Sequence, residues 1–442
     1  MNQFYSEFPL PSKADWEAVL TKELKGANPK EKLNYTDELE GISIQSYIHS
    51  SENNTIEADP TVYPFVRSGK IENNDWSNGV RIIVEKEEKA NQQALNLLMK
   101  GADSLVFDIT IKSLDTEKLL KGIELQYLKV IFECDSLAVV EQLLPSISSF
   151  SGNCFLRLDF EKINFKKALT LLKDCKIPFC SVNAFQIQQI GGSINQELAF
   201  GLSVGNEYIV RLLEEGISIN EAVTLIHFNF GVGARYFNEV AKLRVFRKLW
   251  SFILTQYGCH LDKKFPNLIA SEIGFTNKSL KDPYTNLLRQ STEVMSAVIS
   301  GSDFVLVNPY DRFSNNGSSD FSRRMALNIS LILKEESYFD KVIDPMGGSY
   351  LIEKIAEKLS KTTWELFQEV DDKGGVMSSE GNSYLLLKVK EIAYKRVTAV
   401  KEGKQTLIGV NKYSNPQVET LEWNDLPKYF GREILVLERE VK

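Results

Sequence analysis

Several features that would classify this chain quickly are scarce or missing. Its five cysteines are odd in number and contain no C-x-x-C pair, so the sequence predicts neither a disulfide framework nor a zinc ribbon. No run of about 18 apolar residues occurs, and the first residues lack a basic segment that leads into an apolar one. We therefore expect reduced thiols in a cytoplasmic protein that is neither secreted nor membrane-spanning.

Charge and histidine content exclude two further classes of protein. The formal net charge is −7, and no lysine-rich or arginine-rich stretch is interleaved with aromatics, which argues against nucleic-acid binding. The three histidines are His49, His227 and His260. None lies three or four residues from another, so no helical metal pair is predicted. His227 lies within an apolar run, which favours a hydrogen-bonded structural residue over a metal ligand.

From residue 80 onward, short apolar runs alternate with longer amphipathic segments. The runs have strand length and lie at residues 80–84, 104–109, 128–133, 154–159, 179–184, 226–230, 268–273 and 304–307. The segments between them predict helices at 90–100, 136–144, 165–175, 194–213, 234–254, 283–299 and 320–334. Apolar strands separated by crossover helices imply a parallel sheet that is covered on both faces. Because no glycine-rich first turn is present, we predict an α/β fold of the (β/α)8 TIM barrel type rather than an open sheet.

Additions are predicted at both ends of the barrel. Residues 1–75 contain five prolines and one amphipathic helix, 13–24, which Asp15 can cap. The apolar face of that helix holds Trp16, Val19, Leu20 and Leu24. This N-terminal arm has few core residues of its own and must pack on something else. We assign residues 76–350 to the barrel, and residues 351–442 to C-terminal helices, at 352–370 and 383–401, and a tail that close it.

Acidic residues occur where the predicted strands end, namely Glu85, Asp108, Asp159 and Glu272. The carboxyl ends of barrel strands line the active site, so these groups could perform acid–base chemistry if two of them approached each other. Strand ends also meet water and acidic residues cap helices, and this structural role is favoured.

The loop 308–320 opens a predicted helix whose free N–H groups could receive an anion. Asp320 reads as the N-cap of that helix and would occupy those donors, so a turn and a cap are favoured here as well.

The predicted helix 234–254 carries a further candidate site. Its basic residues are Lys242, Arg244, Arg247 and Lys248. They could meet a phosphorylated ligand, whereas a solvated helix face or a subunit contact explains them equally well. The apolar stripe of the same helix comprises Phe237, Val240, Ala241, Leu249, Trp250 and Ile253. Nothing in the helix alone distinguishes these alternatives.

Five segments between residues 196 and 350 stand in a distinctive order. They are Gln-Glu-Leu-Ala-Phe at 196–200, Glu-Val-Ala-Lys-Leu-Arg at 239–244, Asp-Pro-Tyr-Thr-Asn-Leu-Leu-Arg at 282–289, Asp-Phe-Ser-Arg-Arg at 320–324 and Asp-Pro-Met-Gly-Gly-Ser-Tyr at 344–350. Together with residues 8–26 and 405–413, they resemble the N-terminal arm and the acyl-CoA-binding barrel of methylmalonyl-CoA mutases. The resemblance runs from residue 8 to residue 413 and implies the same barrel fold.

The same resemblance indicates what this barrel has lost. In active members of the family, adenosylcobalamin supplies a radical while barrel histidines and a tyrosine position the thioester. Phe185 and Gln186 match the family's Tyr-His pair, and Ala270 and Leu306 match two further histidine positions. Gln186 can donate a hydrogen bond but cannot carry a proton. The resemblance therefore implies a filled or narrowed barrel with no catalytic residue, no bound cofactor and no metal.

The cobalamin-binding domain of active members would require a further α/β segment with a lower-ligand histidine after residue 413. The 29 residues that follow contain no histidine. The resemblance thus implies the small (beta) subunit of a heterodimeric methylmalonyl-CoA mutase of propionate metabolism, in a form that lacks this domain. We expect a noncatalytic subunit that stabilises the large subunit, which holds adenosylcobalamin and interconverts methylmalonyl-CoA and succinyl-CoA. By the same resemblance, the N-terminal arm wraps this partner.

Two alternatives stay open. The chain could be the substrate-binding subunit of an acyl-CoA mutase that works with a separately encoded cobalamin-binding protein and uses Phe185 and Gln186 at the altered site. The barrel could also retain acyl-CoA affinity as a regulatory binding module.

Overall fold

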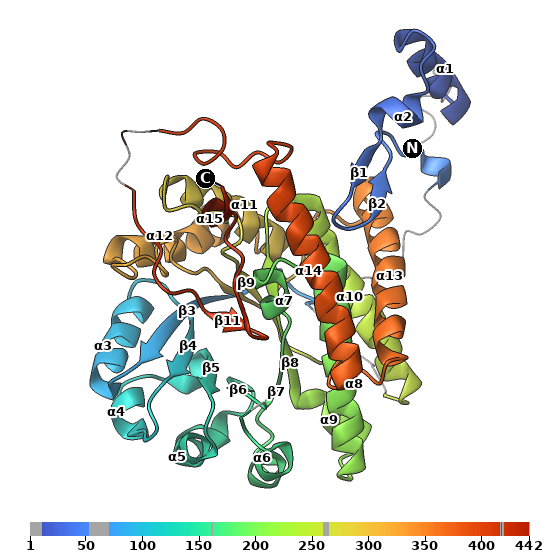
Figure 1. Ribbon diagram of the computed structural model, residues 1–442. Helices are drawn as coiled ribbons and strands as arrows, with labels where there is room; N and C mark the ends of the chain where they lie inside the picture. Colours follow the sequence, from blue (N-terminus) through green and yellow to red (C-terminus); the bar gives the residue numbers. More distant parts are fainter. Residues whose placement is uncertain are drawn as a thin grey trace.

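Parallel strands form the centre of the computed structural model, which describes residues 11–52, 70–160, 162–259, 265–415, 417 and 420–441. The strands are β3 (Ser77–Val84), β4 (Ser104–Ile109), β5 (Lys129–Cys134), β6 (Cys154–Leu158), β7 (Cys180–Asn183), β8 (Ile226–Val232), β9 (Ile269–Ile273) and β10 (Phe304–Leu306). They pair in the order β6-β5-β4-β3-β10-β9-β8-β7. Since the first strand, β3, pairs in parallel with both β4 and β10, the sheet curls into a nearly closed (β/α)8 barrel, as predicted (Figure 1).

The barrel has a seam between β6 and β7, where no ladder joins the described residues. One backbone hydrogen bond crosses it, from the Leu156 amide to the Pro178 carbonyl at 2.8 Å. His227 on β8 adds a second link, because its Nε2 lies 3.0 Å from the Leu156 carbonyl oxygen. Burial lowers the pKa of His227 to about 3, so the ring is neutral and Nε2 donates. The structural role predicted for His227 is confirmed.

Helices cover the outside of the barrel. The predicted ones are present as α3 (Glu87–Leu98), α5 (Leu137–Ile147), α6 (Phe165–Leu172), α8 (Ile194–Glu214), α10 (Tyr236–Gln256), α11 (Thr285–Ile299) and α12 (Asp320–Leu331). Within the described residues of the barrel, three further α-helices were not predicted, namely α4 (Thr116–Leu120), α7 (Phe185–Gln189) and α9 (Ile219–Thr224). Each has six residues or fewer, which is too short for a 3.6-residue period to show in the sequence.

The core between the barrel wall and the long helices is mainly aliphatic but contains an aromatic cluster between β8 and α10. The Phe228 ring of β8 lies 4.6 Å from that of Phe246 and 5.2 Å from that of Trp250, both on α10. Helix α8 approaches this cluster at Gly205, where an added Cβ would lie 2.9 Å from the Trp250 ring. Glycine therefore permits the close packing of α8 on α10.

Two helix caps differ from the prediction. Helix α1 (Lys13–Glu23) is capped by Ser12, whose Oγ accepts from the Asp15 amide at 3.2 Å while the Asp15 carboxylate accepts from the Ser12 amide at 2.9 Å. Ser319 likewise caps α12 by accepting from the Ser322 amide at 3.1 Å. Asp15 and Asp320 lie inside the first turn, where the helix dipole also favours acidic residues, and this is why sequence alone took each for the cap.

The N-terminal arm has two parts. A hairpin of β1 (Tyr35–Asp37) and β2 (Ile42–Ile44) is tied to the barrel, because Asp37 accepts from Asn238 at 2.9 Å and Glu40 accepts from the Ile194 amide at 2.9 Å. By contrast, α1 and α2 (Pro29–Leu33) bury no residue and stand away from the barrel in Figure 1. Residues 53–69 of the predicted arm, and His260, lie outside the described residues.

The C-terminal part covers one side and one end of the barrel. Helix α13 (Tyr350–Asp371) packs on α10 and α8, and α14 (Ser379–Lys401) packs on α13 and α8. The tail that follows contains the hairpin of β11 (Lys428–Tyr429) and β12 (Arg432–Glu433) and the short α15 (Leu437–Glu440). Glu438 anchors it by accepting from the Leu280 amide at 3.0 Å and from the Trp423 indole at 2.8 Å. None of the described helices has both the length and the apolar character that a membrane crossing requires.

Candidate functional site

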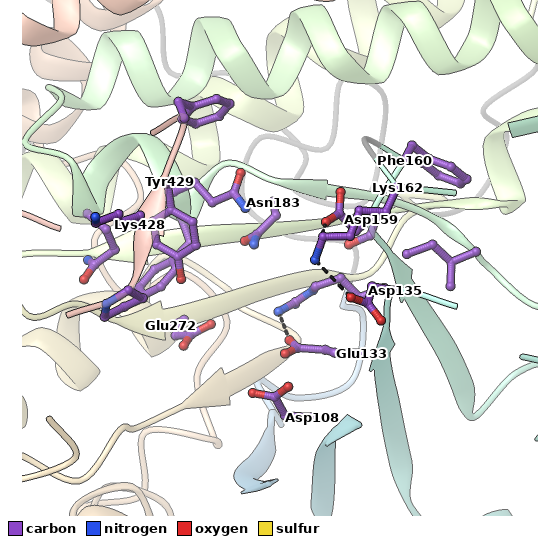
Figure 2. Close-up of a pocket in the computed structure, with 18 of the residues that line it drawn as sticks. Asp108, Glu133, Asp135, Asp159, Phe160, Lys162, Asn183, Glu272, Lys428 and Tyr429 are labelled. Carbon is purple, nitrogen blue, oxygen red and sulfur yellow. Dashed lines mark hydrogen bonds and ion pairs between the residues drawn. The ribbon is translucent and has the colours of Figure 1, made fainter. Parts of the chain in front are cut away.

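A cavity of about 880 Å³ lies at the carboxyl ends of the strands, the end at which TIM barrels place their active sites. Side chains from β3, β4, β5, β6, β7 and β9 form its floor, and the tail hairpin contributes Tyr429 and Phe430. Figure 2 shows the carboxylates of Asp108, Glu133 and Glu272 converging on one part of this cavity.

A charged layer forms the floor of the cavity and comprises Arg81, Asp108, Glu133, Arg157 and Glu272. Arg81 is its centre, since its guanidinium pairs with Glu133, with Glu272 at 3.2 Å and with Asp108 at 3.7 Å. Arg157 pairs with Glu133 from the other side. Burial would raise the pKa of Glu133, but the two guanidinium groups lower that pKa to about 2. Burial, reinforced by the neighbouring Glu133, raises the pKa of Asp108.

Amide side chains complete the binding of Glu272. Asn308 donates to its Oε1 at 2.9 Å and Asn229 donates to its Oε2 at 3.2 Å. Arg312 in turn donates to the Asn308 side-chain oxygen at 2.7 Å. Each oxygen of this buried carboxylate thus has a neutral donor in addition to Arg81, as a buried charge requires.

Three of the four predicted strand-end carboxylates meet at the cavity. Asp108, Asp159 and Glu272 line it, whereas Glu85 is exposed outside it. Asp108 and Glu272 pair with Arg81, and Asp159 pairs with Lys162 at 3.4 Å. Because each carboxylate has a cation, the arrangement is that of a charge network rather than of two carboxyls sharing a proton.

An apolar layer lies directly beneath the charged layer and comprises Val106, Ile131, Phe155, Leu268, Ala270, Phe304 and Leu306. Four of these residues precede a charged-layer residue by two positions on the same strand, and a strand presents every second side chain to the same face. At the matching position on β3, Gly79, an added Cβ would collide with the Phe304 ring. Phe304 therefore occupies the space that Gly79 leaves, and the barrel axis is filled below the cavity.

Of the four positions that match the family's active-site residues, two line the cavity and two belong to the apolar layer beneath it. Phe185 and Gln186 begin the short helix α7 after β7, and both line the cavity. Ala270 and Leu306 belong to the apolar layer, where each is at most 3% exposed. The structure therefore brings two of them to the cavity and places the other two in the filling beneath it.

Three of the four basic residues of α10 are engaged inside the protein, whereas Lys248 is exposed, as a solvated helix face predicts. Lys242 pairs with Glu197 at 3.1 Å, Arg244 with Asp344 at 2.5 Å, and Arg247 donates to the Ser300 carbonyl at 2.9 Å. All three side chains are buried. Neither a phosphorylated ligand nor a solvated face accounts for them, so both interpretations were wrong for these residues. The predicted apolar stripe was wrong at Phe237, which is 49% exposed.

The loop after β10 is a turn and a cap, as predicted. The Ser319 hydroxyl caps α12, and the Asp311 carboxylate accepts from the Ser319 amide at 3.0 Å. These contacts occupy donors at the start of the helix that an anion would otherwise use.

Comparison with known proteins places this barrel in a family. A family model described as methylmalonyl-CoA mutase matches residues 171–432. A Porphyromonas gingivalis protein named methylmalonyl-CoA mutase small subunit is 32% identical to this chain. The alignment covers 93% of this chain and 71% of that protein. The chain belongs to the methylmalonyl-CoA mutase family.

Longer members of the methylmalonyl-CoA mutase family are also similar. The human mitochondrial methylmalonyl-CoA mutase is 25% identical over 93% of this chain, which spans 62% of that protein. Among solved structures, a Yersinia pestis dihydropteroate synthase is similar over 59% of this chain and 93% of the synthase chain. The sequence identity is 12% and the TM-score is 0.33. That likeness is too slight to bear on function.

Neither histidine in the described part of this mutase-family chain lines the cavity. His227 is fully buried and bonded to Leu156, and His49 lies in the arm with its Nδ1 2.8 Å from the Ser51 hydroxyl. No cluster of three or more metal-binding side chains occurs in the described part of the chain. None of the five cysteines forms a disulfide, and burial raises the pKa of Cys134, which lines the cavity, to about 12.

Sequence reasoning missed the arginines at the centre of the site. Arg81 sits in the middle of an apolar run and Arg157 near the end of another. A cation on the buried face of a predicted strand must be paired, and that signal could have directed attention to Glu133 and Glu272. The mutase-family resemblance had directed attention instead to positions of missing histidines.

Proposed function

We propose that this chain is the noncatalytic small subunit of a heterodimeric methylmalonyl-CoA mutase. In this role it stabilises a large subunit that holds adenosylcobalamin and interconverts methylmalonyl-CoA and succinyl-CoA. The Porphyromonas gingivalis relative bears the name small subunit, which implies a larger companion. The observation that carries the proposal is the apolar layer that fills the barrel axis.

A thioester that reacts inside a barrel needs room along the axis and polar groups that stabilise its carbonyl oxygen. Phe155, Phe304 and Leu306 offer neither, since they fill the interior with buried hydrocarbon. No histidine occurs among the described residues that line the cavity. Gln186 at its edge can donate a hydrogen bond but cannot transfer a proton.

The arm supports the association with a partner. Helix α1 has no buried residue, and its Val19 is 59% exposed. Trp16 on the same helix stacks on Tyr47 with ring centroids 4.3 Å apart, and Tyr47 is itself partly exposed. An exposed apolar face rimmed by polar residues marks an interaction site. We propose that this face contacts the large subunit within an obligate interface of more than about 2,000 Å².

A cytoplasmic location belongs to the same proposal. No disulfide joins the five cysteines and most of them are buried, which suits a reducing compartment.

Coexpression tests the proposal. The chain would be coexpressed with a mutase-family chain that carries a cobalamin-binding domain, and purified alone and as the complex. We expect a 1:1 complex whose rearrangement activity outlasts that of the large subunit alone, and no turnover by this chain with adenosylcobalamin. Turnover by this chain with a separate cobalamin-binding protein, in the absence of any large subunit, would contradict the proposal.

A pair of surface variants tests the role of the arm. Val19→Asp places a charge on the exposed face of α1, and we expect it to reduce copurification with the large subunit. Tyr127→Asp is the matched control, because Tyr127 is 79% exposed outside the arm, and we expect it to copurify normally. Equal copurification of both variants with the large subunit would show that the exposed face of α1 is not part of the interface.

A further inference from the structure

Three hydrogen-bond donors on the floor of the cavity are buried and make no hydrogen bond with the described residues. They are the Nε of Arg81, the Nε of Arg157 and the Oγ of Ser181. Native proteins satisfy nearly all buried polar groups, so such donors point to an acceptor from outside the chain.

Two of these donors, those of Arg157 and Ser181, lie on the strands that border the seam of the barrel. Arg157 projects from β6 and Ser181 from β7, the two strands between which the ladder is missing. Ser181 stands opposite His227 in the β7–β8 register. The Nη1 of Arg157 is engaged by Glu133, which holds the guanidinium in place and leaves Nε for another acceptor.

The charges around the cavity favour an anion. Its lining contains six cations, Arg81, Arg157, Lys162, Arg211, Arg312 and Lys428. It contains five acids, Asp108, Glu133, Asp135, Asp159 and Glu272, and each of them is paired with a cation of the lining. With six cations and five acids, the lining carries one net positive charge, and it also offers the unpartnered donors. An occupant that supplies acceptor oxygens and negative charge complements them.

The shape of the cavity limits the size of the occupant. Its volume is about 880 Å³, and the apolar layer closes the axis beneath the charged floor. The tail hairpin supplies Tyr429 on another side, and burial, together with Glu272, raises the pKa of this phenol to about 12, so it remains a neutral donor. A compact molecule fits within the mouth, whereas a long chain has no path down the barrel.

We propose that the cavity binds a small organic carboxylate, whose oxygens accept hydrogen bonds from Arg157 Nε and Ser181 Oγ. The ligand lies wholly in the mouth of the barrel, above Phe155 and Phe304. Its binding requires neither a corrinoid nor a second subunit, so it can be measured on the full chain alone, and its failure leaves the small-subunit role untouched.

Calorimetric titration of the full chain tests this site with malonate, succinate and inorganic phosphate as probes. Ser181→Ala removes one donor, and Arg157→Lys keeps a positive charge for Glu133 but removes the Nε–H. We expect at least one carboxylate to bind with a Kd below about 1 mM, and each variant to weaken binding about tenfold. Ser203→Ala is the matched control, because the Ser203 Oγ is also buried without a partner but lies on α8 away from the cavity lining. It should bind like the parent.

Alkylation of cysteines locates the ligand. Cys134 lines the cavity, whereas Cys175 is partly exposed outside it and serves as the internal reference. We expect the bound carboxylate to slow alkylation of Cys134 but not of Cys175, as measured by mass spectrometry.

Three results would overturn the proposal. The first is the absence of binding by either carboxylate at about 10 mM. The second is unchanged affinity in both Ser181→Ala and Arg157→Lys, with folding verified by circular dichroism. The third is binding of methylmalonyl-CoA that is lost in the same two variants, which would mean that the cavity accepts a thioester. Binding of phosphate alone is a case of the first result, because neither carboxylate then binds.

Discussion

The barrel interior contains two adjacent layers that are built on the same strands but stabilised in different ways. The apolar layer, with Phe155 and Phe304, is stabilised by close packing, which is non-directional. The charged layer above it, centred on Arg81, depends on specific partners, since a buried ion that loses its counterion is strongly unfavourable. The comparison teaches that one layer closes the axis while the other keeps the mouth polar and open.

Removal of Arg81 should have the largest effect on stability. Arg81→Met leaves Glu133 and Glu272 buried without their common cation, and we expect the free energy of unfolding to fall by about 4 kcal/mol. Urea denaturation measures the change. Arg439→Met, which removes an exposed ion pair to Glu433, should cost less than about 1 kcal/mol. Similar losses of unfolding free energy in the two variants would show that the charged layer stabilises the protein no more than an exposed ion pair does.

Truncation of a side chain in the apolar layer should have the next largest effect on stability. Phe304→Ala removes a ring that is 1% exposed, and we expect a loss of about 3 kcal/mol from burial and from the cavity left behind. Phe321→Ala, at a ring that is 49% exposed, is the control and should change little. A loss below about 1 kcal/mol at Phe304 would mean that the layer collapses to fill the space.

A double-mutant cycle tests whether Phe304 fills the space next to Gly79. Gly79→Ala alone should destabilise the protein by about 2 kcal/mol, because the new methyl group collides with the Phe304 ring. The same substitution in a Phe304→Ala background should cost almost nothing. Thermal or urea unfolding of the four proteins measures the coupling, and additive effects would show that the two residues do not compete for space.

The smallest expected effect concerns His227, the polar residue at the level of the apolar layer. Its ring lies 5.6 Å from that of Phe155, and burial lowers its pKa from 6.5 to about 3. The unfolded chain therefore binds this proton more readily, so stability falls as the pH drops from 6.5 toward 3.

At about pH 6 this proton linkage destabilises the parent by about 1 kcal/mol, and we expect His227→Gln to abolish that loss. Glutamine does not titrate and can still donate to the Leu156 carbonyl. Urea unfolding across this pH range checks the result, and an identical pH profile in parent and variant would contradict a neutral, buried imidazole.

Much of the barrel could be predicted because its signals are local. Every run assigned as a strand is a strand, since a parallel strand buried on both faces reads as a short continuous apolar run. The roles of Lys242, Arg244 and Arg247 could not be predicted in the same way. Arg244 pairs with Asp344, which lies 100 residues away in the chain. The position of a basic residue in the helical period is the same whether its side chain meets water or a distant carboxylate.

The candidate site follows the same division. The sequence identified the strand-end carboxylates Asp108, Asp159 and Glu272, because strand ends are local features. It also suggested a filled interior, which the apolar layer confirms. It did not indicate that Arg81 and Arg157 would keep the mouth of the barrel polar, nor that the tail hairpin with Tyr429 would lie against it.

By itself, the sequence determined the alternation of strands and helices, the barrel and the family, because each is written in the spacing and order of nearby residues. Only the tertiary structure decided which of the buried charges meet, that the β6–β7 seam leaves Arg157 and Ser181 with unused donors, and that Phe304 occupies the space beside Gly79. Those outcomes depend on distances between strands far apart in the chain, which no local pattern encodes.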